Sequence, residues 1–312
     1  MKIKQIYRKN HRVAWPIYVA AAICISFSSL HATGNSGIGY HAAPFLRISP
    51  AARQVAMGEA AVALADDINL LRYNIGGLGN LHKVMLAANF HNWFEDTQQG
   101  GVSLAFPSKY GVLGVDFLYF NEGEIEEVDE FFRKTGGTGH SDDIMLTFGY
   151  GSYLKLLNNN LSLGASVKVL RQTLVGEQST TLALDVGSQL RLKHISVGAT
   201  VQNIGLSRVK FYDLASSLPE IFKLGTAFRL PINESAKLNI AADIGWTSKE
   251  NLRYFLGGEV DLSDLLALRT GYKFHDVALS PWSAGFGCIS IIFPIRFSGA
   301  SCLTQLSTSV FP

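Results

Sequence analysis

The chain has 312 residues, of which 47% are hydrophobic and only 17% are charged, and it contains 30 glycines. This charge content is low for a soluble globular protein, yet the sequence lacks the unbroken apolar runs of a helical membrane protein. The net charge is +2 and no Lys/Arg-rich run follows the first dozen residues, so we expect no nucleic-acid partner.

Residues 1–32 have the composition of a signal peptide. A basic stretch is followed by a mostly apolar stretch over residues 13–27, and residues 30–32 offer a cleavage site. An uncleaved anchor helix is the alternative reading. Pro16 and the serines that follow position 25 shorten the apolar core, which favours cleavage.

Export would place Cys288 and Cys302 in an oxidising compartment. A disulfide between them and two unrelated thiols are both compatible with the sequence. The chain has no CxxC pair and no His/Cys spacing typical of a metal site, so we expect no bound metal.

Residues 45–81 differ from the rest of the chain because they are rich in small residues. Seven alanines occur between positions 51 and 65, and Ser49 followed by Pro50 has the pattern of a helix N-cap with proline at the first helical position. We therefore expect a slim helix within an N-terminal segment that spans residues 33–82.

From Lys83 onward the sequence consists of segments about ten residues long in which apolar and polar residues alternate. Over residues 161–169, for example, Leu, Leu, Ala, Val and Val alternate with Ser, Gly, Ser and Lys. A period of two indicates strands with one apolar face. We count thirteen or fourteen such segments, which predicts an all-β fold.

Charged residues in these segments fall on the parity opposite to the large aliphatic residues. They are Asp116, Asp143, Lys168, Asp185, Arg191, Lys223, Arg229, Asp243, Arg253, Glu259, Arg269 and Lys273. A lipid-facing Arg or Lys at mid-bilayer costs roughly 2 to 4 kcal/mol, so a transmembrane barrel requires one face free of charge. A soluble β-sandwich also alternates, but the segment length, the aromatic residues near segment ends and the alternation of tight with long connections favour the membrane. We expect residues 83–312 to form a transmembrane antiparallel β-barrel of about 14 strands, with an atypical ending after about residue 288.

The dimensions of such a barrel suggest a place for the N-terminal segment. Fourteen tilted strands close into a cylinder roughly 28 Å across, which leaves a lumen of about 15 Å once side chains are counted. A helix about 10 to 12 Å wide fits that lumen as a hatch. A periplasmic or surface helix is the alternative. Arg53, Glu59, Asp66 and Asp67 would then pair with inward charges of the strands, and the full set of candidate hatch and lumen residues is Arg53, Glu59, Asp66, Asp67, Asn74, Lys168, Asp185, Arg229, Asp243 and Arg269.

Residues 45–81 resemble the start of the PorV/PorQ-type branch of the FadL-like outer-membrane proteins, in the stretches FLRI, AR, AMGEA, VA and ADD and then in YN and GL. Similar stretches follow at Gly164 (GASVKVL), Val201 (VQNIG), Leu218 (LPEIFKLGTAFRL) and Leu266 (LALRTGYKF). The resemblance extends to about residue 286, and its first block is the most specific part.

This resemblance implies a fourteen-stranded barrel whose N-terminal segment forms a hatch in the lumen. FadL-like members pass hydrophobic small molecules, and PorV-like members serve as accessory or shuttle components of type IX secretion. The chain departs from the family in two places. The Asn-Pro-Ala-Gly-Leu run of the family reads Asn-Ile-Gly-Gly-Leu at residues 74–78, and the alternation breaks from Cys288, so that Phe311 is followed by Pro312 instead of ending the chain.

We therefore expect a channel or transporter for hydrophobic small molecules. We expect it to reside in the bacterial outer membrane after its signal peptide has been cleaved. An accessory or shuttle component of type IX secretion and a soluble exported β protein are the alternatives. The expected partners are outer-membrane lipid, hydrophobic small molecules and secretion-system proteins. No GxSxG or other catalytic constellation is present, so we expect neither enzymatic activity nor a cofactor.

Overall fold

The computed structural model describes most of the chain beyond position 40. The described residues are 41–64, 66–92, 97–129, 131, 133–156, 159–211, 214–233, 235–248, 250–262, 266–274, 281–288, 296–297, 300–301 and 306–310. The described residues other than Glu250 and Asn251 belong to one compact unit, which comprises Ile38–Ser248 and Leu252–Pro312. The expected signal peptide and Cys302 lie outside the described residues, whereas Cys288 is exposed.

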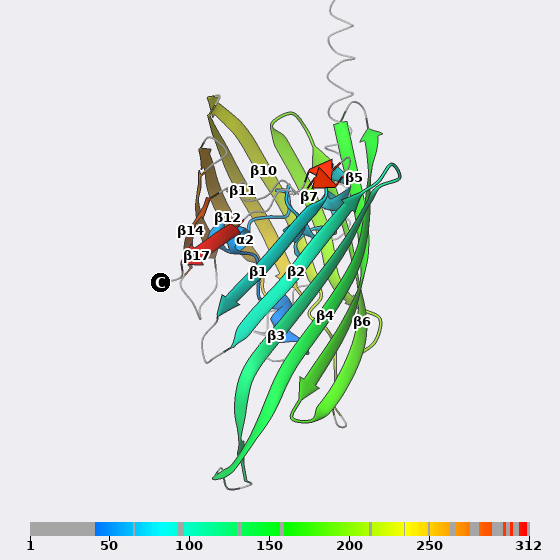
Figure 1. Ribbon diagram of the computed structural model, residues 1–312, viewed down its shortest axis with the longest axis vertical. Helices are drawn as coiled ribbons and strands as arrows, with labels where there is room; N and C mark the ends of the chain where they lie inside the picture. The colour runs from blue at the N-terminus through cyan, green and yellow to red at the C-terminus, as the bar shows by residue number, and fades with distance from the viewer. Residues whose placement is uncertain are drawn as a thin grey trace, which may run out of the picture. The chain divides into compact units, whose positions relative to one another are not determined.

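An antiparallel sheet dominates the larger unit, in which each strand pairs with its neighbours in the chain apart from breaks for two small hairpins, β8–β9 and β15–β16 (Figure 1). The prediction of an all-β fold is confirmed. In order, the strands are β1 (Met85–Asn92), β2 (Gln98–Pro107), β3 (Val112–Val128), β4 (Lys134–Leu156), β5 (Asn159–Leu174), β6 (Glu177–Arg191), β7 (Ile195–Gly205), β10 (Ile221–Asn233), β11 (Ala236–Thr247), β12 (Arg253–Leu262), β13 (Leu266–Phe274) and β14 (Trp282–Cys288).

Short strands make up the remainder. β8 (Val209–Phe211) and β9 (Leu214–Ser216) form a hairpin between β7 and β10, and β15 (Arg296–Phe297) pairs with β16 (Ala300–Ser301). β17 (Leu306–Val310) pairs with β14 and extends the sheet at that edge. Within the described ranges β1 and β17 are the two edges of the sheet and do not pair with each other, so the sheet contains twelve long strands and β17 rather than a closed ring of 14.

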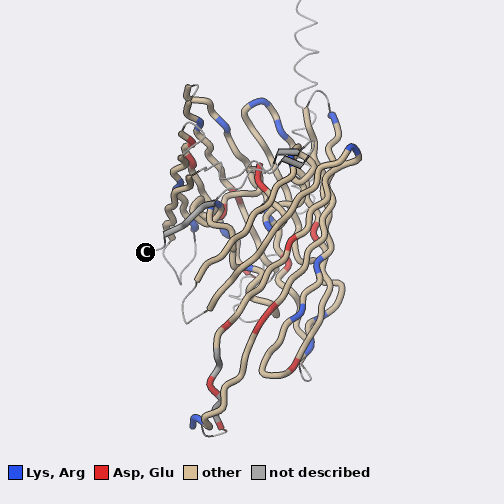
Figure 2. Tube along the Cα trace, viewed as in Figure 1, with Lys and Arg blue, Asp and Glu red and all other residues tan. Residues whose placement is uncertain are grey.

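The two faces of the sheet are opposite in character, as the alternation predicted. One face carries large exposed apolar side chains, such as Phe148 at 51%, Leu268 at 50% and Ile244 at 47% exposure. The other face buries polar and charged side chains. They include Asp116, Asp143, Lys168, Asp185, Asp243, Glu259 and Arg269. Figure 2 shows acidic and basic residues spread along the strands, with further acidic residues toward the tip of the β3–β4 hairpin.

The N-terminal segment lies against the charged face, where Figure 1 draws it in blue. It consists of short helices, namely the 3-10 helix η1 (Pro44–Arg47), the α-helix α2 (Ala52–Ala56) and the 3-10 helices η2 (Ile68–Arg72) and η3 (Ile75–Asn80). Of these, α2 packs on β13 and β14 near one edge of the sheet, while η3 packs on β4, β5 and β6. Because one segment contacts strands so far apart in the sheet order, the sheet must curve around it.

The slim helix predicted across the alanines is present only in part, because α2 has five residues. Its N-cap is Ala51 without a side-chain hydrogen bond, not Ser49. Gly58 and Glu59 follow the helix with φ of 62° and 63°, a left-handed conformation that ends an α-helix. Among the described residues, no helix is long and apolar enough to cross a bilayer.

Asn74 fixes the turn at which the chain departs from the FadL-like pattern. Its Oδ1 accepts a hydrogen bond from Gly76 N at 2.9 Å, and its Nδ2 donates to Val62 O at 2.8 Å and Ser188 O at 3.1 Å. A Cβ at position 76 would overlap the backbone of Ser188 on β6. Glycine at this position therefore lets η3 approach the sheet, which a larger residue would prevent.

We predict that Gly76→Ala lowers the free energy of unfolding by about 1 to 3 kcal/mol, because η3 and β6 must separate to admit the methyl group. Thermal melts followed by circular dichroism of the purified protein would measure the change. Gly100→Ala is the matched control, since a Cβ there meets its nearest atom, Phe90 Cδ2, at an ordinary 3.5 Å. Equal melting temperatures for the two variants would contradict the prediction.

Candidate functional site

Arg53 is the centre of the contact between the N-terminal segment and the sheet. Its Nε and Nη2 donate to the two carboxylate oxygens of Glu259 on β12 at 2.8 and 2.6 Å. Its Nη1 donates to Asp66 at 2.5 Å and to Asp67 at 2.9 Å, so one guanidinium joins three carboxylates. The bidentate contact fixes the geometry of α2 relative to β12.

The Glu259 carboxylate has further donors within the sheet. Arg269 Nε on β13 donates to its Oε2 at 2.6 Å, and Asn239 Nδ2 on β11 donates to its Oε1 at 3.0 Å. Burial alone would lower the pKa of Arg53, but the charges of Asp66, Glu259 and Asp67 raise that pKa well above its ordinary value. Arg53 therefore remains charged at any physiological pH, and the network keeps its ion pairs.

Glu59 forms a second link to the same part of the sheet. Its Oε1 accepts a hydrogen bond from Lys273 Nζ on β13 at 2.7 Å, and its Oε2 lies 3.8 Å from Lys223 Nζ on β10. Burial by itself would raise the pKa of Glu59, but the two lysines lower it below its ordinary value. The carboxylate is therefore held in its charged form between two strands that are not neighbours.

Asp243 on β11 binds the backbone of the N-terminal segment directly. Its Oδ2 accepts hydrogen bonds from Ala61 N at 2.7 Å and from Val62 N at 2.9 Å. Asn74, within the same segment, donates from its Nδ2 to Val62 O and to Ser188 O on β6. The backbone around Val62 is thus clamped between β11 and β6.

Lys168 and Asp185 form a buried ion pair of 2.8 Å that belongs to the sheet itself. The ladder between β6 and β7 shifts its register beside Asp185, and Asn203 on β7 has φ of 59°. Asn203 N donates to Asp185 Oδ1 at 2.8 Å, while Asn203 Oδ1 accepts from Lys168 Nζ at 2.7 Å. The bulge therefore builds a polar cluster from β5, β6 and β7.

The ten residues predicted for the hatch and lumen consequently fall into three groups. Arg53 joins Asp66 and Asp67 to Glu259, which Arg269 also binds. Arg229 lies 3.6 Å from Asp66, and Glu59 is bound to Lys273 on β13. Asp243 and Asn74 clamp the backbone at Val62. Lys168 and Asp185 form the cluster within the sheet.

Arg72 is an anchor that the sequence interpretation missed. Its Nε and Nη2 donate to the two oxygens of Asp116 on β3 at 2.9 and 2.6 Å, and Ser103 Oγ donates to the same carboxylate at 2.5 Å. Asp116 was recognised as an inward charge, and Arg72 lies in the segment expected to meet it. The sequence feature that could have identified this anchor is a cationic residue at the end of the mostly apolar η2.

The charged face becomes apolar over β3, β4 and β5 next to the long connection between β7 and β10. Phe120, Met145 and Leu170 are buried there, and the ring of Phe45 from η1 stacks on Phe120 with a centroid distance of 5.8 Å. The β8–β9 hairpin contributes Val209 to the same cluster. Apolar residues of the N-terminal segment thus cover an apolar stretch of the inner face.

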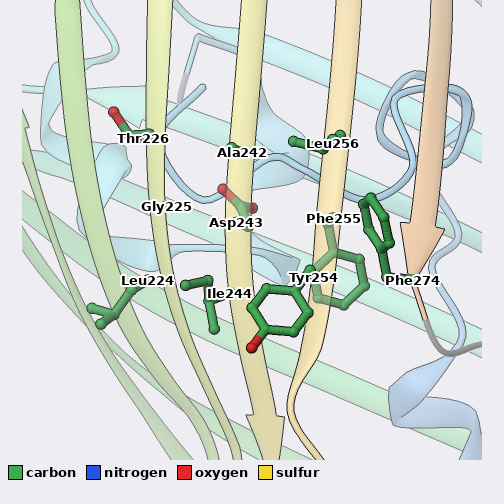
Figure 3. A pocket seen from close by; sticks show the side chains of 10 residues that line it. All are labelled: Leu224, Gly225, Thr226, Ala242, Asp243, Ile244, Tyr254, Phe255, Leu256 and Phe274. Atoms are coloured by element: carbon green, nitrogen blue, oxygen red, sulfur yellow. The ribbon is translucent and has the colours of Figure 1, made fainter.

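A hollow of about 660 Å³ lies over β10, β11, β12 and β13 (Figure 3). Exposed apolar side chains such as Leu224, Ile244 and Tyr254 line it, together with Asp243 and Phe255, which are buried on the inner face. Its lining is mostly apolar and contains no set of acid, base and nucleophile. Among the described residues, no group of His, Cys, Asp and Glu is placed to hold a metal ion.

No protein-family model matches this chain, and no curated protein matches its sequence. The resemblance of residues 45–81 to the FadL-like proteins therefore stays a prediction.

We predict that Arg53→Met lowers the free energy of unfolding by about 3 to 5 kcal/mol, because three carboxylates lose the cation that they share. Urea titration of the protein in detergent would measure the loss. Arg133→Met is the control, since Arg133 is 72% exposed and its partner Asp129 lies on the β3–β4 hairpin. This control should leave the unfolding midpoint unchanged, and an equally small effect of Arg53→Met would show that the Arg53 network does not hold the segment.

Proposed function

We propose that this protein is an outer-membrane β-barrel protein of the FadL-like type that passes hydrophobic small molecules, with residues 33–82 as its hatch and residues 83–312 as its barrel. The main support for the proposal is that the polarity of the two sheet faces is the reverse of that in a soluble protein. Its apolar face is the exposed one, and its charged face is buried around the N-terminal segment.

A lipid environment accounts for this arrangement better than water does. Monomeric soluble proteins rarely expose a contiguous apolar patch of more than a few hundred Å². Here the exposed apolar side chains continue from β2 to β14 and leave no charged residue among them on the strand centres. A bilayer favours such a surface, while the interior charges are neutralised by Arg53, Glu59 and Arg72 of the segment.

The apolar stretch of the inner face supports a hydrophobic solute rather than a polar one. The cluster around Phe45, Phe120 and Leu170 lies toward the side with the longer connections, which in outer-membrane barrels is the outer side. A solute entering there would meet apolar side chains first and the ion-paired segment next. Phe45 would act as the first barrier, since its buried ring joins η1 to Phe120 on β3.

A charge placed on the exposed face distinguishes a membrane protein from a soluble one. We predict that Phe148→Arg abolishes assembly in the outer membrane, because arginine at mid-bilayer costs roughly 2 to 4 kcal/mol. Carbonate extraction and heat-dependent gel mobility would measure assembly. Tyr110→Arg, in the turn between β2 and β3 at 74% exposure, is the control and should assemble normally. Normal folding of Phe148→Arg, with release by carbonate, would identify a soluble protein instead.

Passage of solutes is tested by uptake into reconstituted vesicles. We expect vesicles that contain the protein to take up a fluorescent fatty acid or an aromatic hydrocarbon faster than empty vesicles do. Phe45→Ala should raise the rate severalfold because it opens the apolar cluster, whereas Phe131→Ala on the exposed β3–β4 hairpin should not. Uptake equal to that of empty vesicles would contradict the transport proposal.

A further inference from the structure

The strands of the sheet are joined by very short turns at one of its two ends. At this end β2–β3, β4–β5, β6–β7, β10–β11 and β12–β13 are connected by only two to four residues each. The chain also enters β1 at this end, because Met85 pairs with Ala105 near the end of β2. We call the part of this end that belongs to β1–β7 the short-turn rim. It comprises residues 82–84, 108–111, 153–156, 159–160 and 192–195.

The short-turn rim is cationic. It carries Lys83, Lys109, Lys155 and Lys193, all of them exposed, together with two histidines. No Asp or Glu occurs in residues 82–84, 108–111, 153–160 or 192–195. The opposite end of β3 and β4 has the reverse charge, since residues 122–134 contain six acidic and two basic residues. Figure 2 shows basic residues at turns of the end opposite the tip of the β3–β4 hairpin.

Tyrosine side chains lie among these cations. Lys109 Nζ lies 4.8 Å from the centroid of the Tyr110 ring, and the Tyr150 hydroxyl on β4 donates to Tyr110 O at 2.7 Å. His82, at the end of the N-terminal segment, packs edge-on against Tyr153 of β4 with a centroid distance of 6.3 Å. These contacts hold the β2–β3 turn and the residues before β1 beside the end of β4. All three tyrosines are exposed, as is typical of tyrosine at the headgroup level of a membrane.

The sheet surface next to these cations is apolar. Phe106 on β2 pairs with Leu113 on β3 directly before and after the turn that carries Lys109, and both side chains are exposed. Leu154, which precedes Lys155, is exposed as well. Cations, tyrosines and apolar side chains therefore follow one another, as at the boundary between lipid headgroups and acyl chains. An acidic peptide would neutralise the cations but would leave the apolar side chains uncovered.

We propose that the short-turn rim binds an anionic glycerophospholipid of the membrane. Lys83, Lys109 and Lys155 supply the charge that meets its phosphate, and Phe106 and Leu113 contact its acyl chains. The inference rests on the outer-membrane barrel proposed above and adds a preference for one class of lipid. Short turns of outer-membrane barrels lie on the periplasmic side, so this lipid belongs to the inner leaflet.

Lipid affinities of the purified full-length protein in detergent, measured by native mass spectrometry, test the site. We expect phosphatidylglycerol to bind at least about tenfold more tightly than phosphatidylcholine, because each lysine near an anionic headgroup contributes about fivefold. The triple variant Lys83→Gln, Lys109→Gln, Lys155→Gln should bind the two lipids equally. If the triple variant does not fold, Lys109→Gln alone should reduce the preference about fivefold.

The matched control removes the same charge from the opposite end of the sheet. It is the triple variant Lys134→Gln, Arg208→Gln, Lys210→Gln, whose three positions are exposed in the β3–β4 hairpin and in the connection between β7 and β10. This control should keep the preference for phosphatidylglycerol, because a preference set by net charge alone would fall equally in both triple variants.

Photocrosslinking in vesicles locates the lipid. A phosphatidylglycerol with a diazirine at the start of one acyl chain should label the peptides of β2 and β3 that contain Phe106 or Leu113. Four results would each overturn the inference. They are equal affinity of the wild type for the two lipids, an undiminished preference in the lysine variant, a lost preference in the control, and labelling confined to the β3–β4 hairpin. Release of the protein from vesicles by carbonate would contradict the barrel itself, which none of these four results would do.

Discussion

The ion pairs of Arg53 set the main constraint on this fold. A sheet that buries carboxylates on its concave face is stable only if cations reach them, because a buried charge without a partner costs several kcal/mol. Arg269 supplies part of the charge that Glu259 needs, and Arg53 supplies the rest from the N-terminal segment. Arg72 meets the same need at Asp116 on β3, which lies on the same face but far from β12 in the strand order. The sheet and the segment are therefore electrostatically incomplete without each other.

The same requirement explains why the segment is built from single turns. A continuous helix would use the amide groups of Ala61 and Val62 internally, whereas here they donate to Asp243. The sheet thus satisfies backbone groups that a helix would have satisfied itself. Helix propensity does not explain the small residues of the segment. Gly76, for example, lets the backbone of η3 approach the backbone of β6. An alanine-rich composition here reflects tight packing against strands.

The sequence predicted the faces of the sheet correctly because strand periodicity fixes which side chains share a face. Lys168, Asp243 and Glu259 could be assigned to the inner face from parity alone. The helix prediction failed because local propensity at the alanines was outweighed by tertiary hydrogen bonds. The sequence predicted that Arg53 would pair with an inward charge of the sheet, but it did not identify Glu259 as the partner. Nothing in the local sequence specifies a partner 206 residues away. Closure into a ring likewise depends on how the two sheet edges meet, which alternation does not encode.

The separation in sequence between Arg53 and its partners also bears on the order of folding. The segment is synthesised first, yet Glu259 and Lys273 lie on β12 and β13, near the end of the sheet. Contacts between residues so distant along the chain carry a large loop-closure cost and form slowly. The earliest part of the chain can reach its final position only after one of the latest strands has joined the sheet. Docking of the segment would therefore report that the sheet has been completed as far as β13.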